Sequence, residues 1–182
     1  MTTRQPANAV VLVIDLQTAM FDGVAVPPIH GADVLVERAR AVTRWARATG
    51  RKVAFIRHDG AAGEVFAPGA PGWAVWPALG QAPEEPTFSK TEGDAFSQPD
   101  VGDWVAGAGA SEVILLGAQT DQCVAATVRG ALDRGLTVSV VSDAHSTWDL
   151  QDETADQVVL RHNAMFASAG ARVITTAALT EA

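Results

Sequence analysis

Short runs of consecutive apolar residues recur along the chain and alternate with segments of helical periodicity. The runs cover residues 10–15, 52–57, 112–117, 137–142 and 171–175, and they are continuous rather than alternating in polarity. Continuous runs of this length are typical of strands that are buried on both faces, and their alternation with helices is the pattern of βαβ units. The sequence therefore predicts an α/β protein with a mostly parallel sheet and helices on both faces.

Three segments between these runs have the spacing of helices. In the first, apolar residues recur from Val34 to Ala46, and Gly50 is placed to end the helix in a left-handed conformation. The second helix is predicted over 122–134 and the third over 152–168. Because the third has a wide apolar side, we expect it to pack on the sheet or on another subunit.

The segment 59–86 has a different character, because it is rich in Gly and Pro and shows no periodicity. We predict a long irregular loop here. Long ordered loops in compact domains often serve binding or catalysis, so this loop is a candidate wall for a pocket.

Composition limits the classes of function. The length of 182 residues and the hydrophobic content of 48% suit one domain with one substantial core, and we expect a single domain over residues 1–182. The net charge of -8 argues against nucleic acids and anionic membranes as partners. One cysteine cannot form an internal disulfide, and no run approaches the about 18 apolar residues that span a bilayer. We therefore expect a cytoplasmic protein with a free thiol.

Three polar residues follow predicted strands. Asp15 ends the first strand, Lys90 ends the short segment 87–90, and Cys123 lies at the start of a helix after the strand 112–117. Because the carboxyl ends of parallel strands meet at one edge of a sheet, we expect these three side chains to converge there.

The three residue types fit the chemistry of a thiol nucleophile. A helix N-terminus and a nearby cation lower the pKa of a thiol, so the sequence predicts a lowered pKa for Cys123. Asp15 is placed to accept the thiol proton and to return it to a leaving group, while Lys90 orients the carboxylate. Backbone N–H groups between Gly117 and Cys123 can stabilise an oxyanion. The predicted cycle is attack, thioester formation and hydrolysis by water.

Several segments together resemble the isochorismatase-like cysteine hydrolase superfamily, which includes nicotinamidases, N-carbamoylsarcosine amidases and isochorismatases. They are VLVIDLQ, FSK, and GAQTDQCVAAT followed by ALDRGLTVSVVSDA, and the resemblance extends over residues 10–175. It implies a three-layer αβα fold whose six-stranded parallel sheet has the order 3-2-1-4-5-6. It also implies that Asp15, Lys90 and Cys123 form a catalytic triad.

The resemblance implies further features of the site. A non-proline cis peptide should join Ala118 to Gln119, and the N–H groups of Gln119 and Cys123 should form the oxyanion hole. Metal-binding relatives carry an Asp-x-His element between the first two strands, and this chain has Asp22 and His30 in that region but no such element, so we expect neither a metal nor another cofactor. Family members commonly form dimers or tetramers, so we expect a homo-oligomer.

The presence of Cys123 favours acyl transfer, and hence a small-molecule amide or lactam as substrate. The loop patterns RHDG, FAPGAPGW and SDAHSTWD resemble a bacterial subgroup that includes streptothricin-hydrolase-like enzymes. Two alternatives remain open. In a vinyl-ether hydrolase of the isochorismatase type, Asp15 would protonate the substrate and Cys123 would be dispensable. In an inactive scaffold or ligand-binding relative, the triad would be expected to have lost a member.

Other polar and aromatic residues are candidates for contacts to the substrate. We interpret Asp121 as a helix-start carboxylate rather than a second base, and His162 as a structural or interfacial residue. The candidate substrate-binding residues are Gln17, Phe21, His58, Trp76, His145 and Trp148. Their alternative roles are structural: Gln17 is also placed to brace the active-site backbone, the two histidines to stabilise loops, and the aromatic residues to pack.

Overall fold

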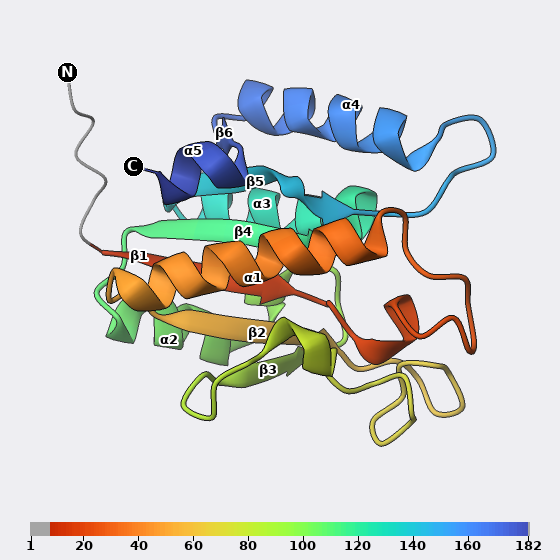
Figure 1. Ribbon diagram of the computed structural model, residues 1–182. Coiled ribbons are helices and arrows are strands. Elements are labelled where there is room, and N and C mark those ends of the chain that lie inside the picture. The colour runs from red at the N-terminus through yellow and green to blue at the C-terminus, as the bar shows by residue number, and fades with distance from the viewer. Residues whose placement is uncertain (1–7, 182) are drawn as a thin grey trace.

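The computed structural model describes residues 8–181, and its centre is a six-stranded sheet. All neighbouring strands are parallel, and their order β3-β2-β1-β4-β5-β6 confirms the predicted topology (Figure 1). The strands are β1 (Ala9–Ile14), β2 (Val53–His58), β3 (Thr87–Lys90), β4 (Glu112–Ala118), β5 (Thr137–Ser146) and β6 (Arg172–Ile174).

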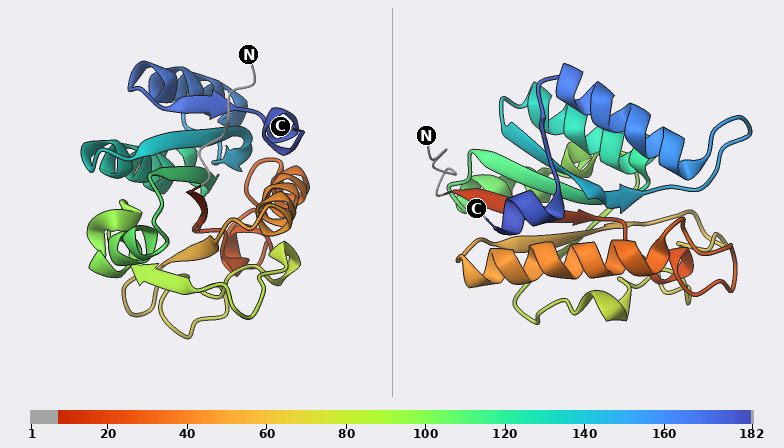
Figure 2. Two further views of the ribbon diagram at one scale, coloured as in Figure 1. Left: turned by 90° about the vertical axis from the view of Figure 1, so that its left-hand side faces the viewer. Right: turned by 45° about the horizontal axis from the view of Figure 1, so that its top comes forward.

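Helices cover both faces of this sheet, as the alternating pattern predicts (Figure 2). One face carries α1 (Ala32–Ala48) and α5 (Thr176–Thr180). The other carries α2 (Pro99–Gly107), α3 (Ala125–Asp133) and α4 (Ala155–Ser168). In the described part of the chain, no helix combines the length and the apolar character needed to cross a membrane.

The core has two parts, one on each side of the sheet, and β1 contributes to both. Val11 and Val13 pack toward α1, whereas Val10, Leu12 and Ile14 pack toward α2 and α3. Each of these side chains is at most 2% exposed. Burial of such a side chain stabilises a fold by about 1.5–3 kcal/mol, which explains why the strand is apolar at every position.

The elements differ from the predictions mainly at their ends. The predicted helix 122–134 starts instead with a π-helical turn, Thr120–Val124, and becomes α-helical at Ala125. The predicted helix 152–168 begins later, at Ala155, because Thr154 and Gln157 form a capping box. The strand β5 is longer than the predicted 137–142, and its extension carries His145 to the carboxyl edge of the sheet. We did not predict α2 or α5.

Candidate active site

Asp15, Lys90 and Cys123 meet at the carboxyl edge of the sheet, although they are far apart in sequence. Asp15 follows β1, Lys90 ends β3, and Cys123 lies in the π-helical turn after β4. Lys90 Nζ donates to Asp15 Oδ2 at 2.7 Å and to Cys123 Sγ at 3.3 Å. The lysine therefore bridges the carboxylate and the sulfur.

The hydrogen bonds among Asp15, Lys90 and Cys123 leave one carboxylate oxygen of Asp15 without a partner. Lys90 Nζ also donates to the carbonyl oxygen of Glu92 at 3.0 Å, so its three N–H groups all have acceptors. The side chains of Lys90 and Asp15 are each 1% exposed. The second carboxylate oxygen, Asp15 Oδ1, is buried and accepts no hydrogen bond from the described residues. It is thus available as a base.

The electrostatics of Cys123 differ from the prediction of a lowered pKa. Burial raises the pKa of the thiol to about 12, and the negative charge of Asp15 adds to this effect. Lys90 opposes it but does not cancel it. The pKa of Lys90 is itself raised, because the charges of Asp15 and Cys123 outweigh the lowering effect of burial, the largest single influence. Cys123 is therefore protonated near neutral pH and needs a base during attack.

The backbone at the ends of β1 and β4 brings Asp15 and Cys123 together. Gly117 pairs with Ile14 and has a φ of 131°, a conformation that favours glycine. A Cβ atom at Gly117 would lie 2.7 Å from Ile14 N and would overlap the Ile14 carbonyl group. Asp15 also has a positive φ, 51°, and the peptide bond between Ala118 and Gln119 is cis. Only glycine fits at position 117.

A cavity of about 340 Å³ opens onto the thiol and the carboxylate. Its lining residues are Asp15, Met20, His58, Phe66, Gln119, Gln122 and Cys123. Phe66 belongs to the segment 59–86, so this loop does form a wall of the cavity as we predicted. We did not predict Met20 or Phe66 as individual lining residues. No motif marks Met20, and Phe66 begins the pattern FAPGAPGW, which indicates a subgroup of the family but not a position in a cavity.

His58 is the one predicted substrate-binding residue that lines this cavity. Its Nδ1 atom is buried without a hydrogen-bond partner. Since a buried polar atom without a partner is unfavourable, His58 Nδ1 is available to a bound molecule.

Of the two roles predicted for Gln17, the structure supports bracing of the backbone and not contact with a substrate. It is fully buried, and its side-chain amide holds two other segments in place. Gln17 Oε1 accepts from the N–H of His58 at 2.9 Å, and Nε2 donates to the carbonyls of His58 at 3.0 Å and Trp73 at 2.8 Å. Gln17 therefore fixes the wall of the cavity instead of facing into it.

The structure also places three aromatic candidates outside the cavity lining. Phe21 and Trp76 stack on each other with their ring centroids 5.5 Å apart. The indole N–H of Trp148 donates to the carbonyl of Pro27 at 2.8 Å. All three pack, partly buried, against the core on the side of α1.

The histidines outside the cavity have structural contacts. His145 is buried and bonded through both ring nitrogens, to Thr120 at 2.9 Å and to Asn163 at 3.0 Å, and it does not line the cavity at Cys123. His162 is buried on α4 and bonds to the Val158 carbonyl at 2.9 Å. Across residues 8–181, no group of three or more His, Cys, Asp or Glu side chains is arranged to hold a metal ion.

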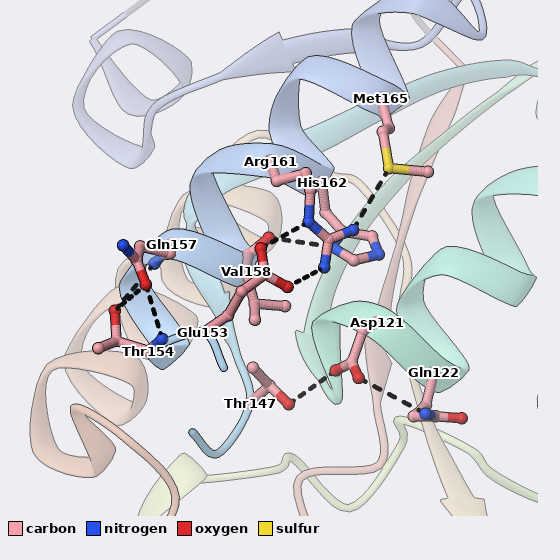
Figure 3. A network of polar contacts seen from close by, with 10 residues as sticks. All are labelled: Asp121, Gln122, Thr147, Glu153, Thr154, Gln157, Val158, Arg161, His162 and Met165. Carbon is pink, nitrogen blue, oxygen red and sulfur yellow. Dashed lines mark hydrogen bonds and ion pairs between the residues drawn. The ribbon is translucent and has the colours of Figure 1, made fainter. Parts of the chain in front are cut away.

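The turn that carries Cys123 is tied to the segment after β5 (Figure 3). Thr147 Oγ1 donates to Asp121 Oδ1 at 2.7 Å, so this carboxylate serves the turn and is not a second base beside the thiol. Nearby, Arg161 of α4 forms a bidentate ion pair with Glu153, which lowers the pKa of Glu153 through a hydrogen bond.

Comparison with known proteins places the chain in a family. Residues 9–178 match the isochorismatase domain family. The chain is 39% identical over 139 residues to a streptothricin hydrolase from Streptomyces noursei, an alignment that covers 76% of this chain and 50% of the relative. The chain thus spans about half the length of this curated relative.

Solved structures share the whole architecture. An isochorismatase from Pseudomonas putida KT2440 has a TM-score of 0.87 and 28% identity, covering 97% of this chain and 92% of its own. A cysteine hydrolase from Pseudomonas syringae pv. phaseolicola 1448A has a TM-score of 0.90 and 20% identity, covering 100% of this chain and 94% of its own, and shows the fold alone. From the family match over residues 9–178, the chain belongs to the isochorismatase family of hydrolases.

Proposed function

We propose that the protein is a cysteine amidohydrolase that cleaves a C–N bond of a small amide or lactam without a cofactor. One observation carries the proposal: Lys90 contacts both the buried carboxylate of Asp15 and the sulfur of Cys123 at the end of a cavity. A nucleophile, a base and an orienting cation are thus within reach of one bound carbonyl group.

The raised pKa of the thiol defines the first step. As the Cys123 sulfur attacks the carbonyl carbon, Asp15 Oδ1 accepts the thiol proton, and the N–H groups of Gln119 and Cys123 stabilise the oxyanion. The C–N bond then breaks, and Asp15 returns the proton to the leaving nitrogen. Water next attacks the thioester while Asp15 takes a proton from it, and the departing sulfur recovers this proton. The products are a carboxylic acid and an amine.

The lining of the cavity favours an amide over isochorismate. Within residues 8–181, no Lys or Arg side chain is among the residues that line the cavity. Lys90, which contacts Asp15, already donates its three N–H groups to Asp15, Glu92 and Cys123. Isochorismate carries two carboxylates, which would have to be buried beside Asp15 without a cationic partner. A neutral amide avoids this cost, and His58 Nδ1 can bond to its polar group. The similarity to a streptothricin hydrolase supports the same choice.

Mass spectrometry of the intact protein tests this function. We expect an acyl adduct on Cys123 after exposure to a panel of small carboxamides and lactams, and no adduct in Cys123→Ala. Cys123→Ala should also lose all hydrolysis of the reactive compound. Hydrolysis of isochorismate that survives in Cys123→Ala, with no adduct from any amide, would establish the vinyl-ether alternative instead. A protein that hydrolyses neither amides nor isochorismate would favour a scaffold or ligand-binding role.

A further inference from the structure

We propose that His145 is a positioning residue for the turn that carries Cys123, acting through a chain of hydrogen bonds. The chain runs from the carbonyl of Ser142 through Asn163 and His145 to Thr120. The inference rests on the proposed function, because the turn Thr120–Val124 and its neighbour Gln119 supply the proposed nucleophile and oxyanion donors.

The contacts join three elements of the fold. Thr120 Oγ1 lies 2.9 Å from His145 Nδ1, and His145 Nε2 lies 3.0 Å from Asn163 Oδ1. Asn163 Nδ2 donates to the carbonyl of Ser142 at 3.1 Å. Thr120 is completely buried, and His145 on β5 is 4% exposed. Asn163 and Ser142 are half-buried, so water is excluded only from the Thr120 end of these contacts.

One fixed acceptor determines the direction of every bond in the chain. The Ser142 carbonyl can only accept, so Asn163 presents its NH₂ group to this carbonyl and its oxygen to His145. That oxygen also only accepts, so His145 carries its proton on Nε2. Nδ1 is then an acceptor, and the hydroxyl of Thr120 must donate to it. Burial lowers the pKa of His145 to about 4, which keeps the ring in the neutral form that this chain requires.

The position of Thr120 links these hydrogen bonds to the residues proposed to react. Thr120 follows Gln119 directly and is three residues before Cys123. The next residue, Asp121, accepts a hydrogen bond from Thr147 (Figure 3), so two consecutive residues of the turn are tied to β5 and the segment after it. Apolar side chains would stabilise this region equally well, because a buried polar chain carries a desolvation cost. Directional bonds in addition fix the orientation of the turn, which oxyanion donors require.

Two reactions of Cys123 distinguish a loss of oxyanion-donor positioning from a general disruption of the site. Acylation by p-nitrophenyl acetate forms a carbon–sulfur bond, expels p-nitrophenolate and needs the oxyanion donors, whereas alkylation by iodoacetamide does not need them. In Thr120→Val, which keeps the side-chain shape but lacks the hydroxyl, we expect acylation to fall roughly 10- to 100-fold. Alkylation should change less than about threefold. Thr120→Ser, which restores the hydroxyl, should acylate at close to the original rate.

Thr43→Val is the matched control. Thr43 is a buried threonine of α1 whose hydroxyl donates to the carbonyl of Arg40 at 3.2 Å. It takes no part in the hydrogen bonds that join Ser142 to Thr120. This variant should lose stability in thermal unfolding without any effect on acylation. Equal losses in both reactions of Thr120→Val, or no loss in either, would overturn the positioning role.

Hydrogen exchange tests the same proposal independently of any substrate. The amides of residues 119–124 should exchange faster in Thr120→Val than in the original protein, but not in Thr43→Val or Thr120→Ser. Unchanged exchange in Thr120→Val would overturn the proposal. A wild-type protein that is alkylated but never acylated would instead contradict the proposed acyl transfer, and exchange alone would then decide the role of His145.

Discussion

Lys90 Nζ lies 2.7 Å from Asp15 Oδ2, and both side chains are almost completely shielded from solvent. In the sheet, β2 lies between β3, which ends at Lys90, and β1, which precedes Asp15, so this pair joins two strands that are not neighbours. A buried pair of opposite charges tolerates the loss of one partner poorly, because the other charge stays buried without compensation.

The first prediction concerns the stability of this pair. Lys90→Met should lower the free energy of unfolding by about 3–5 kcal/mol in urea denaturation, since it leaves the Asp15 carboxylate uncompensated. The double variant Asp15→Asn with Lys90→Met should recover part of the loss. As a control, Arg161→Met breaks the exposed pair with Glu153 and should have a far smaller effect. A Lys90→Met protein as stable as the original would contradict the prediction.

The second prediction concerns the ionisation of Cys123. Because the charge of Asp15 raises the pKa of the thiol, Asp15→Asn should lower this pKa, and thiolate absorbance should appear at lower pH than in the original protein. Lys90→Met should shift the titration the other way, since Lys90 lowers the thiol pKa. Acylation of Asp15→Asn by p-nitrophenyl acetate should nevertheless fall about 100-fold or more, because the base is lost. A faster Asp15→Asn protein would show that Asp15 is not the base.

The third prediction concerns Gln17. Gln17→Leu leaves the N–H and carbonyl of His58 and the carbonyl of Trp73 without their partner, so the free energy of unfolding should fall by about 2–4 kcal/mol. Hydrogen exchange in the loop 59–86 should become faster. Gln81→Leu, which removes two bonds of a half-buried side chain, should cost less than about 1.5 kcal/mol. Similar losses in the two variants would argue against the clamp.

The fourth prediction concerns pH and His145. Its pKa is about 4 in the folded protein, below the ordinary value of 6.5, so the unfolded chain binds more protons between these values. Stability should therefore fall as the pH is lowered from 6.5 toward 4. The contribution of this residue is about 1 kcal/mol per pH unit, best measured above about pH 5 where most carboxylates stay ionised. In His145→Gln this part of the slope should disappear, and equal slopes would contradict the assignment.

The sheet and the proximity of Asp15, Lys90 and Cys123 could be predicted from the sequence, because both follow from simple rules. Strands buried on both faces must be apolar at every position, so β1 and β4 are visible as continuous runs. Polar residues at the carboxyl ends of parallel strands converge at one edge, which is why Asp15 and Cys123 are found together.

Features that depend on distant segments could not be predicted in the same way. The thiol pKa depends on how completely Cys123 is buried, and this depends on side chains from elsewhere in the chain. The clamp of Gln17 depends on the path of the loop 59–86, which has no periodicity. By contrast, α2 left a local signal that we did not use: Pro99 occupies its first turn, and Val101 and Val105 lie four residues apart.

The contact between Gly117 and Ile14 has a consequence for protein engineering. Mutant libraries that aim at new substrates have more freedom at Phe66, a partly buried loop residue that shapes the cavity without carrying the chemistry. Position 117 offers no such freedom, because any added carbon would push the first and fourth strands apart. Directed evolution of this protein should therefore diversify its loops and leave Gly117 unchanged.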